Sequence, residues 1–448
     1  MRILGVLLIC ALAGCDAPPA RSTHDRVDAT PGVAATAAPA SSPTASARRA
    51  PASAGVVPDA GILFVAGADD VIYRYDGRTG ALDAIWAKST FGPRSPNGAY
   101  VFGRAGGAEF LGWDGAKMSV TCGARFTVSV VAGIGCTSVG TDGVYVQLSD
   151  EQHARQILPP DWGASSPVLS PDGRRLLVVR SLEPRPGPGM DPGLSALWLV
   201  GPDGRPREVY RPTDRGVLAT PVWSPDGTKS IVRQIESTSN SFAADGVGIS
   251  TILVDLGTGA SRSLGVTRSE TWSADGRLAF VRGAGRMTWW NKELVVLDAN
   301  GTEHRISAAI DPAHVALAPA WGPRGEIAWV SGPAVDDYNG AGYIDGAGAG
   351  QRVGAILGEG RDEQITCAAG RVVEGISWSV DGERLLVLCR KPGNDPRPLE
   401  LWLYRFKDGT SVPLVTGVGS DDLARGFGFY GAQPSLSTVA AWSLATSP

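Results

Sequence analysis

The chain has few charged residues and no concentration of positive charge. Asp, Glu, Lys and Arg make up 19% of its 448 residues, and the net charge is −4. Lys and Arg form no stripe or cluster along the sequence, and such a cluster is what lets a protein follow a phosphate backbone. We therefore predict that nucleic acid is not a partner.

Residues that commonly build catalytic or metal sites are also scarce. The chain has four His, and it contains no HExxH, CxxC or His-x-His pattern from which a zinc site could be built. It lacks the Gly-x-Ser-x-Gly motif of α/β-hydrolases, and about thirty residues follow Gly417, too few for such a domain. We therefore predict no catalytic residue, no metal and no cofactor, and a protein that is not an enzyme.

The amino terminus carries one apolar run, Ile3 to Leu12, which is too short to span a bilayer permanently. It ends in Leu-Ala-Gly-Cys, which resembles the bacterial lipobox, where a signal peptidase cuts before the Cys and that Cys then carries lipid. The resemblance implies a signal peptide over residues 1–14 and a lipid anchor at Cys15. The protein would then be exported and attached to the cell envelope, although the sequence does not say at which membrane. The alternative is an ordinary secretory signal with Cys15 as an incidental thiol.

Residues 15–58 contain almost no large apolar side chain and consist mainly of Ala, Pro, Ser and Thr. Nothing in this composition can form a core. We expect a disordered tether that holds the folded body away from the bilayer. An alternative is a segment that folds on a partner.

From residue 59 to residue 448, strand-length apolar runs alternate with Gly-rich turns. Six related turns recur: RSPNG ending at Gly98, LSPDG at Gly173, WSPDG at Gly227, WSADG at Gly276, WGPRG at Gly325 and WSVDG at Gly382. Asp can hydrogen-bond the backbone of a tight turn and Gly accepts positive φ, so each copy predicts a hairpin. A second turn after most copies supplies two further strands. Four antiparallel strands per repeat are typical of a blade, which predicts an all-β fold, a β-propeller.

The Trp-Ser-Pro-Asp-Gly turn followed by an alternating strand resembles the TolB-type propeller repeat, which is WD40-like, over about residues 90 to 415. The resemblance is strong for the fold and weak for function. Three copies depart from it: Arg94 and Leu169 replace the Trp, and WGPRG lacks both Ser and Asp. The Trp residues of the repeat are Trp223, Trp272, Trp321 and Trp378. Their fixed place beside the turn favours packing between blades over stacking on a ligand.

The spacing of the turn glycines sets the number of blades. From Gly173 to Gly382 the intervals are about fifty residues, so the folded body has room for seven or eight blades. The first unit has three strand-like runs, and LSTVAAWS near the carboxyl terminus could supply its fourth. We favour eight blades with a shared closing blade, and seven is the alternative.

Four cysteines follow the tether, an even number in an oxidising compartment. Their positions in neighbouring repeats favour two disulfides, Cys122 with Cys136 and Cys367 with Cys389. Four buried free thiols are the alternative.

The connections between second and third strands are unusually long and rich in Gly and Pro. Because all follow the same strand of a blade, they should emerge on one rim. Four aromatic residues in them mark the candidate binding face: Trp289, Trp290, Tyr338 and Tyr343. The alternative is tolerated surface loops without a role.

These observations favour an envelope scaffold that binds another protein. A first alternative is the binding or sensing of a small molecule or glycan at the propeller channel. A second alternative is a propeller hydrolase or lyase.

Overall fold

A computed structural model of the chain separates into two compact units, residues 1–47 and residues 48–448. The structure describes residues 50 to 443 of the second unit, with gaps. The longer gaps are 184–192, 237–248, 284–291, 307–313, 334–351, 391–398 and 420–435; shorter ones fall between 68 and 154, at 215, and between 358 and 370. The predicted signal peptide and Cys15 therefore lie outside the described residues.

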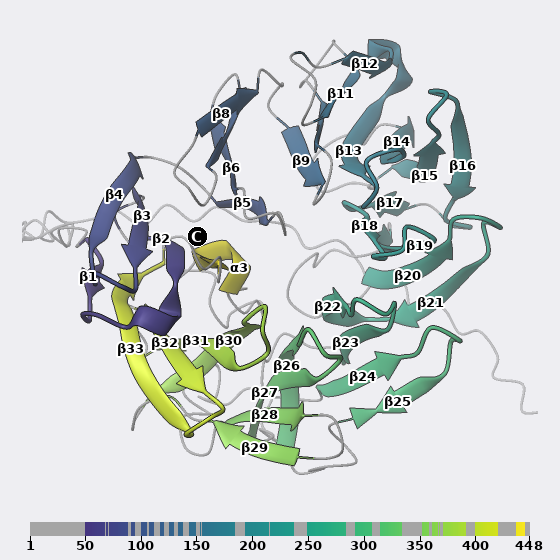
Figure 1. Cartoon of the computed structure of the whole chain (residues 1–448). Coiled ribbons are helices and arrows are strands. Elements are labelled where there is room, and N and C mark those ends of the chain that lie inside the picture. The colour runs from purple at the N-terminus through teal and green to yellow at the C-terminus, as the bar shows by residue number, and fades with distance from the viewer. Residues whose placement is uncertain are drawn as a thin grey trace, which may run out of the picture. The chain divides into compact units, whose positions relative to one another are not determined.

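The second unit is built from antiparallel sheets that follow one another around a ring (Figure 1). The first four groups are β34 (Ala440–Ser443) with β2 (Ile62–Ala66), β3 (Val71–Asp76) and β4 (Leu82–Ala87); β5 (Phe91–Arg94), β6 (Tyr100–Arg104), β7 (Gly107–Leu111) and β8 (Lys117–Val120); β9 (Arg125–Ser129), β10 (Gly133–Thr137), β11 (Val144–Leu148) and β12 (Arg155–Leu158); and β13 (Ala164–Leu169), β14 (Leu176–Glu183), β15 (Leu194–Val200) and β16 (Pro206–Tyr210).

The next four groups are β17 (Gly216–Leu218) and β18 (Val222–Trp223) with β19 (Lys229–Glu236), β20 (Ile249–Asp255) and β21 (Ser261–Gly265); β22 (Thr267–Trp272), β23 (Leu278–Arg282), β24 (Glu293–Leu297) and β25 (Glu303–Arg305); β26 (His314–Trp321), β27 (Ile327–Pro333), β28 (Arg352–Leu357) and β29 (Arg361–Ile365); and β30 (Val372–Trp378), β31 (Arg384–Arg390), β32 (Leu399–Arg405) and β33 (Thr410–Val418). One short helix, α3 (Leu436–Val439), precedes β34. The fourth and fifth groups share one nine-stranded sheet through a single parallel pair, Leu194 with Gly216.

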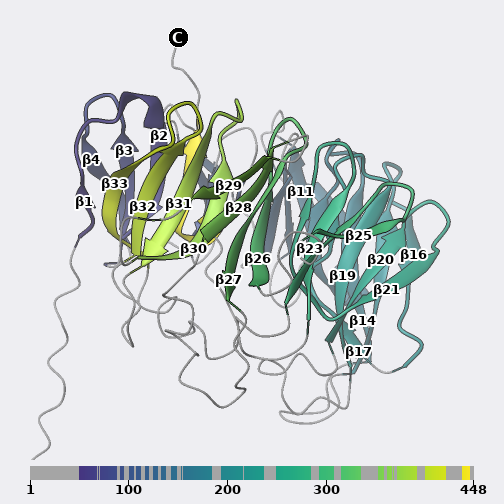
Figure 2. The same cartoon turned by 90° about the horizontal axis from the view of Figure 1, so that it is seen from below.

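This arrangement confirms the predicted β-propeller. The strands of neighbouring groups stand side by side (Figure 2), and their facing side chains fill the space between them with buried apolar residues. Tyr75, Phe64 and Phe280 are among the largest fully buried side chains. Since each sheet is apolar on both faces, a single blade would leave both faces exposed, and stacking in a ring removes that cost.

The ring closes as the sequence predicted, through strands from both ends of the chain. β34 pairs with β2 in antiparallel register from Ile62 opposite Ser443 to Val65 opposite Ala440. The carboxyl-terminal strand therefore completes the first blade. The boundary of the tether needs a correction: β1 (Ala52–Ser53) pairs with β33 and η1 (Pro58–Ala60) packs at the same joint, so residues 52–58 belong to the folded body.

The repeated turns have the hydrogen bonds that their sequence predicts. Ser224 donates to Asp226 (2.6 Å), Asp226 accepts from the Thr228 amide (3.0 Å), and Gly227 has a φ of 67°. In the divergent turn WGPRG, the carboxylate of Glu326 accepts from the amide of Arg324, the residue that stands in the place of the Asp (2.8 Å). The turn therefore keeps its shape with a different acceptor.

The repeated Trp side chains join neighbouring blades, as predicted. The indole Nε1 of Trp223 donates to the Val168 carbonyl (2.9 Å), that of Trp321 to Thr271 (3.0 Å) and that of Trp378 to Ala320 (3.0 Å). Each acceptor belongs to the first strand of the preceding blade. Trp272 is the exception, because its buried Nε1 has no hydrogen-bond partner among the described residues.

Candidate functional site

The two rims of the propeller differ in the connections that they carry. We call the end with the Ser-x-Asp-Gly turns the turn rim, and the opposite end, where second and third strands are joined, the loop rim. The long connections leave the loop-rim ends of β14, β19, β23, β27 and β31. The aromatic residues of the candidate binding face, Trp289, Trp290, Tyr338 and Tyr343, lie outside the described residues. The strands that flank these connections are described.

Lys292 is a buried cation at the loop rim. It directly precedes β24, and its relative exposure is 4%. Burial lowers the pKa of Lys292 from its ordinary 10.5 to about 7, and the positive charge of Arg268 lowers this pKa in the same direction. An amine of this kind is largely neutral near pH 8 and can accept a proton.

Arg268 reaches the same face of the blade from the first strand. It lies opposite Val281 on β23, and Val281 lies opposite Leu294 on β24, two residues after Lys292. Because residues two apart on a strand share a face, Arg268 and Lys292 lie on one side of this sheet. Burial lowers the pKa of Arg268, as does the positive charge of Arg233, while Glu270 opposes the change.

Glu270 holds the neighbouring part of the first strand. Its carboxylate accepts from Arg233 Nη2 (2.8 Å), Thr251 (3.1 Å) and Thr267 (2.6 Å), groups that belong to two adjacent blades. Burial raises the pKa of Glu270, but Arg233 and Thr267 outweigh burial and hold this pKa below its ordinary value. Glu270 is therefore a buried anion at the seam between these blades.

A β-bulge in β22 lies between Arg268 and Glu270. The register of β22 on β23 shifts between Arg268 and Thr271, and Ser269 has a φ of 54°. Ser166 (φ 49°) and Ala318 (φ 46°) lie at the same distance before the turn in β13 and β26. Bulges re-aim side chains, and positive φ costs about 1–3 kcal/mol for such residues. In Figure 1, β22 and β26 lie nearer the centre of the ring than β25 and β29, so these two bulged strands are on the channel side of their blades.

A second set of buried charges lies at the loop rim of the last blade. Glu374 and Arg390 form an ion pair whose side chains are each 3% exposed. Burial raises the pKa of Glu374 to about 7, although Arg390 opposes the rise. In the same blade, Arg371 donates to the Glu400 carboxylate from Nε (3.1 Å) and from Nη2 (2.9 Å). These groups add further charge to the loop rim.

A disulfide also lies at this end of the propeller. Cys367 follows the last strand of one blade, Cys389 lies in β31 of the next, and their sulfurs are bonded. This is one of the two pairings expected from the sequence. For the other, Cys122 lies outside the described residues, as does the side chain of Cys136, which belongs to β10.

Within the part of the chain that the structure describes, no group of three or more His, Cys, Asp or Glu residues could hold a metal ion. Among the same residues, no helix combines the length and apolar character needed to cross a membrane.

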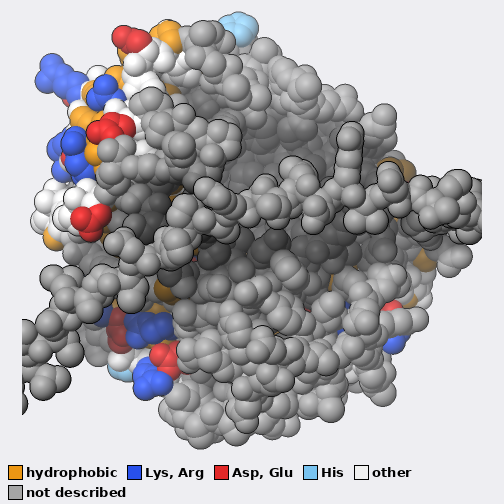
Figure 3. Space-filling model, turned by 180° about the vertical axis from the view of Figure 1, so that it is seen from behind, with side chains coloured by type: hydrophobic (Ala, Val, Ile, Leu, Met, Phe, Trp, Pro, Cys, Tyr) orange, Lys and Arg blue, Asp and Glu red, His pale blue; other side chains and the backbone are white. Residues whose placement is uncertain are grey.

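His304 is exposed and pairs with Asp298 (2.7 Å). Figure 3 shows described side chains of both charge signs close together at the periphery.

Sequence reasoning missed Lys292, Arg268 and Glu270. The available signal was weak: Lys292 is a charged residue between a long connection and a strand-like run, and Arg268 and Glu270 are charged residues within a strand-like run. Sequence reasoning placed the working surface on this rim but selected aromatic residues instead.

Comparisons with known proteins agree on the fold. No protein-family model matches the chain, and no curated protein does. Among solved structures, an acylaminoacyl peptidase of Pyrococcus horikoshii is similar with a TM-score of 0.42 and 14% identity, over 72% of this chain and 52% of that one. A puromycin-hydrolyzing peptidase of Mycobacterium tuberculosis gives 0.45 and 12%, over 83% and 56%. An oligogalacturonate lyase from Vibrio parahaemolyticus gives 0.41 and 14%, over 79% and 84%.

The chain spans about half the length of these two peptidases. At such identity the likeness shows the fold alone. Two predictions nevertheless need a correction, those of a protein-binding scaffold and of a protein that is not an enzyme. Both are contradicted by the neighbours, which are peptidases and a lyase.

Proposed function

We propose that this protein is a propeller enzyme of the hydrolase or lyase class whose reaction centre lies at the loop rim, with Lys292 as general base. The observation that carries the proposal is the position of Lys292. This buried Lys lies between a long connection and β24, on the same face of its blade as Arg268. Buried ionisable groups with displaced pKa values are concentrated at working sites. The repeat-rich turn rim has no comparable buried cation among the described residues.

Both reaction classes need what Lys292 offers. A hydrolase uses a base to activate water, and a lyase uses one to remove a proton from carbon. Arg268 beside the base suits a substrate that carries or develops negative charge in the transition state. Glu270 keeps Arg268 in place by fixing the bulge at Ser269 to the adjacent blade.

The test is a substrate panel with the full-length protein, covering uronate oligosaccharides, whose cleavage by elimination creates an absorbing double bond, and peptide and ester substrates. Lys292→Gln should lower the rate on the accepted substrate by about 10²–10⁴-fold, the range for loss of a general base. The rate of the unmutated protein should rise with pH through about 7, because Lys292 loses its proton there.

Lys229 provides the matched control. It is the first residue of β19 at the turn rim, and its ammonium donates to the Ala299 carbonyl (3.0 Å). Lys229→Gln should leave the rate unchanged. No activity on any substrate of the panel, or equal activity in Lys292→Gln and the unmutated protein, would contradict the proposal.

The cellular setting belongs to the same proposal. The protein is exported, lipidated at Cys15 and attached to the envelope by its tether, and its blades are of the TolB type, eight in number as the strand groups suggest. An envelope protein partner stays a prediction. Incorporation of labelled palmitate that is lost in Cys15→Ser tests the anchor.

A further inference from the structure

The residues just after the tether form a strap across the joint of the ring. We call residues 50–60 the N-terminal strap. On one side it contacts the last blade: Ala52 and Ser53 pair with Thr416 and Val415 of β33, and the Ala54 amide donates to the Leu414 carbonyl (2.9 Å). This adds a fifth strand to the outer edge of that blade.

The strap also contacts the first blade. The Ser53 hydroxyl donates to the Gly80 carbonyl (2.7 Å), and the hydroxyl of Tyr75, whose ring is fully buried, donates to the Gly55 carbonyl (2.8 Å). The Val57 amide donates to the Gly77 carbonyl (2.8 Å). The same eleven residues therefore bind both blades that meet at the joint.

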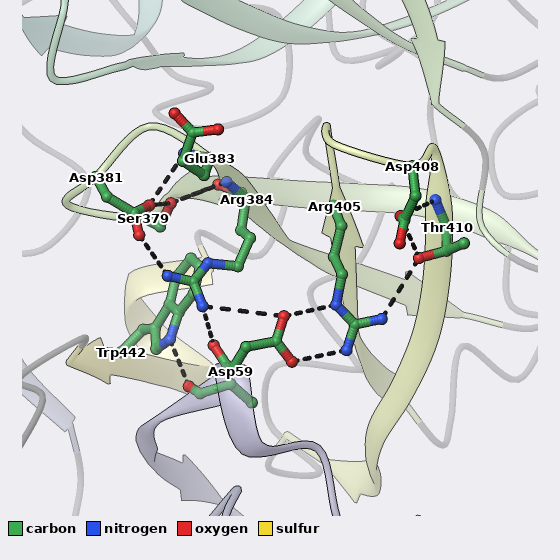
Figure 4. A network of polar contacts seen from close by, with 10 residues as sticks. Asp59, Ser379, Asp381, Glu383, Arg384, Arg405, Asp408, Thr410 and Trp442 are labelled. Carbon is green, nitrogen blue, oxygen red and sulfur yellow. Dashed lines mark hydrogen bonds and ion pairs between the residues drawn. The ribbon is translucent and has the colours of Figure 1, made fainter.

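Asp59 is the centre of this contact (Figure 4). Its carboxylate accepts from both Nε and Nη2 of Arg405, at 2.5 and 2.7 Å, and its carbonyl accepts from Arg384. The neighbouring Ala60 carbonyl accepts from Nε1 of Trp442 in β34 (2.7 Å). A two-point Arg–carboxylate contact is stronger and more directional than an ordinary surface ion pair. Strap, last blade and carboxyl-terminal strand are thus tied together.

The position of this contact matters because of how the ring is closed. The first blade is completed by hydrogen bonds between β2 and β34, so the two ends of the chain meet there without a covalent link. For β2 to move away from both β34 and the last blade, the strap must also leave β33 and Arg405, since it runs directly into β2. We infer that the N-terminal strap is a lock that holds the joint between β2 and β34 closed, and that its release lets the ring open there.

Hydrogen exchange of the full-length protein tests this lock. Asp59→Asn keeps the shape of the side chain and removes its charge. Amides of β2 and β34 should then exchange at least about tenfold faster, while strands on the far side of the ring keep their rates. Ala54→Pro removes the amide that donates to Leu414, without changing any charge, and should act in the same direction.

Glu303→Gln is the matched control. Glu303 accepts from Arg262 of the preceding blade (Arg262 is 47% exposed) and from Arg282 (2.9 Å), so it is also an ion-pair centre between blades, at a seam away from the joint. It should leave exchange in β2 and β34 unchanged. Unchanged exchange in both strap variants would overturn the inference, and so would an equal rise throughout the ring.

Discussion

The turn rim and the loop rim are ends of the same strands, but they treat charge in opposite ways. At the turn rim, Asp226 is surrounded by donors: burial raises its pKa, but hydrogen bonds from Ser224 and Thr228 outweigh burial and keep this pKa low. At the loop rim, burial lowers the pKa of Lys292 and raises that of Glu374, both to about 7, whereas Arg233 and Thr267 hold the pKa of Glu270 below its ordinary value. The turn rim therefore stabilises the fold, whereas the loop rim holds groups whose charge costs stability, as working sites commonly do.

Contacts between blades follow the same division. At the turn rim, an Arg near the turn of one blade reaches the next: Arg277 donates to Gly325, Arg324 to Asp381 and Arg384 to Asp59, in each case to a backbone carbonyl. The last of these contacts reaches the strap. At the loop rim of the last blade, one seam is instead bridged by the disulfide Cys367–Cys389.

The largest expected effect on stability comes from this disulfide. The double substitution Cys367→Ala and Cys389→Ala should lower the free energy of unfolding by about 3 kcal/mol, because the bond restricts the unfolded chain over 22 residues. Ser224→Ala, which removes one turn-rim hydroxyl, should cost about 1 kcal/mol. Urea unfolding measures both. A cost for the disulfide no larger than that for Ser224→Ala would show that the loop rim does not need its covalent bridge.

An intermediate effect concerns pH. The pKa of Glu374 in the folded protein, about 7, lies above its ordinary 4.5, so the folded state binds the extra proton and stability falls as pH rises from 4.5 to 7. For Asp226 the folded pKa is below 3.8, so its contribution is present above that pH and is lost as pH falls below it. Unfolding followed across pH should give a flatter curve between pH 4.5 and 7 for Glu374→Gln, and below pH 3.8 for Asp226→Asn. The same response in both variants would remove the contrast between the rims.

The smallest effect compares two Trp residues of the turn rim. Trp321→Phe removes an indole that donates to Thr271, whereas Trp272→Phe removes one whose Nε1 has no partner among the described residues. Trp321→Phe should therefore cost about 1 kcal/mol more than Trp272→Phe. Thermal unfolding of the two variants measures the difference, and equal costs would show that the indoles act by packing alone.

Local patterns explain why so much of the fold was predictable. The turn at Ser224 is specified by neighbours within five residues, and the alternation after it specifies a strand. The closing strand near Trp442 was predicted because the first unit lacked a partner. The strap escaped prediction since its contacts at Ala52 and Ala54 are made by the backbone, which any composition can supply. Its composition does not differ from that of the tether before it, so the sequence gives no sign that the strap is folded.

By itself, the sequence determined the propeller, its turns, its closing strand and the pairing of Cys367 with Cys389, because these depend on short spacings and on a repeat that must bury its faces. Only the tertiary structure decided that Lys292 lies on the same face as Arg268 and that Asp59 meets Arg405. These pairs come from residues far apart in the chain or separated by a bulge, so their meeting depends on strand register and on the stacking of blades. The chain has few charged residues, and several of them, among them Lys292, Glu374 and Arg390, are buried at the loop rim.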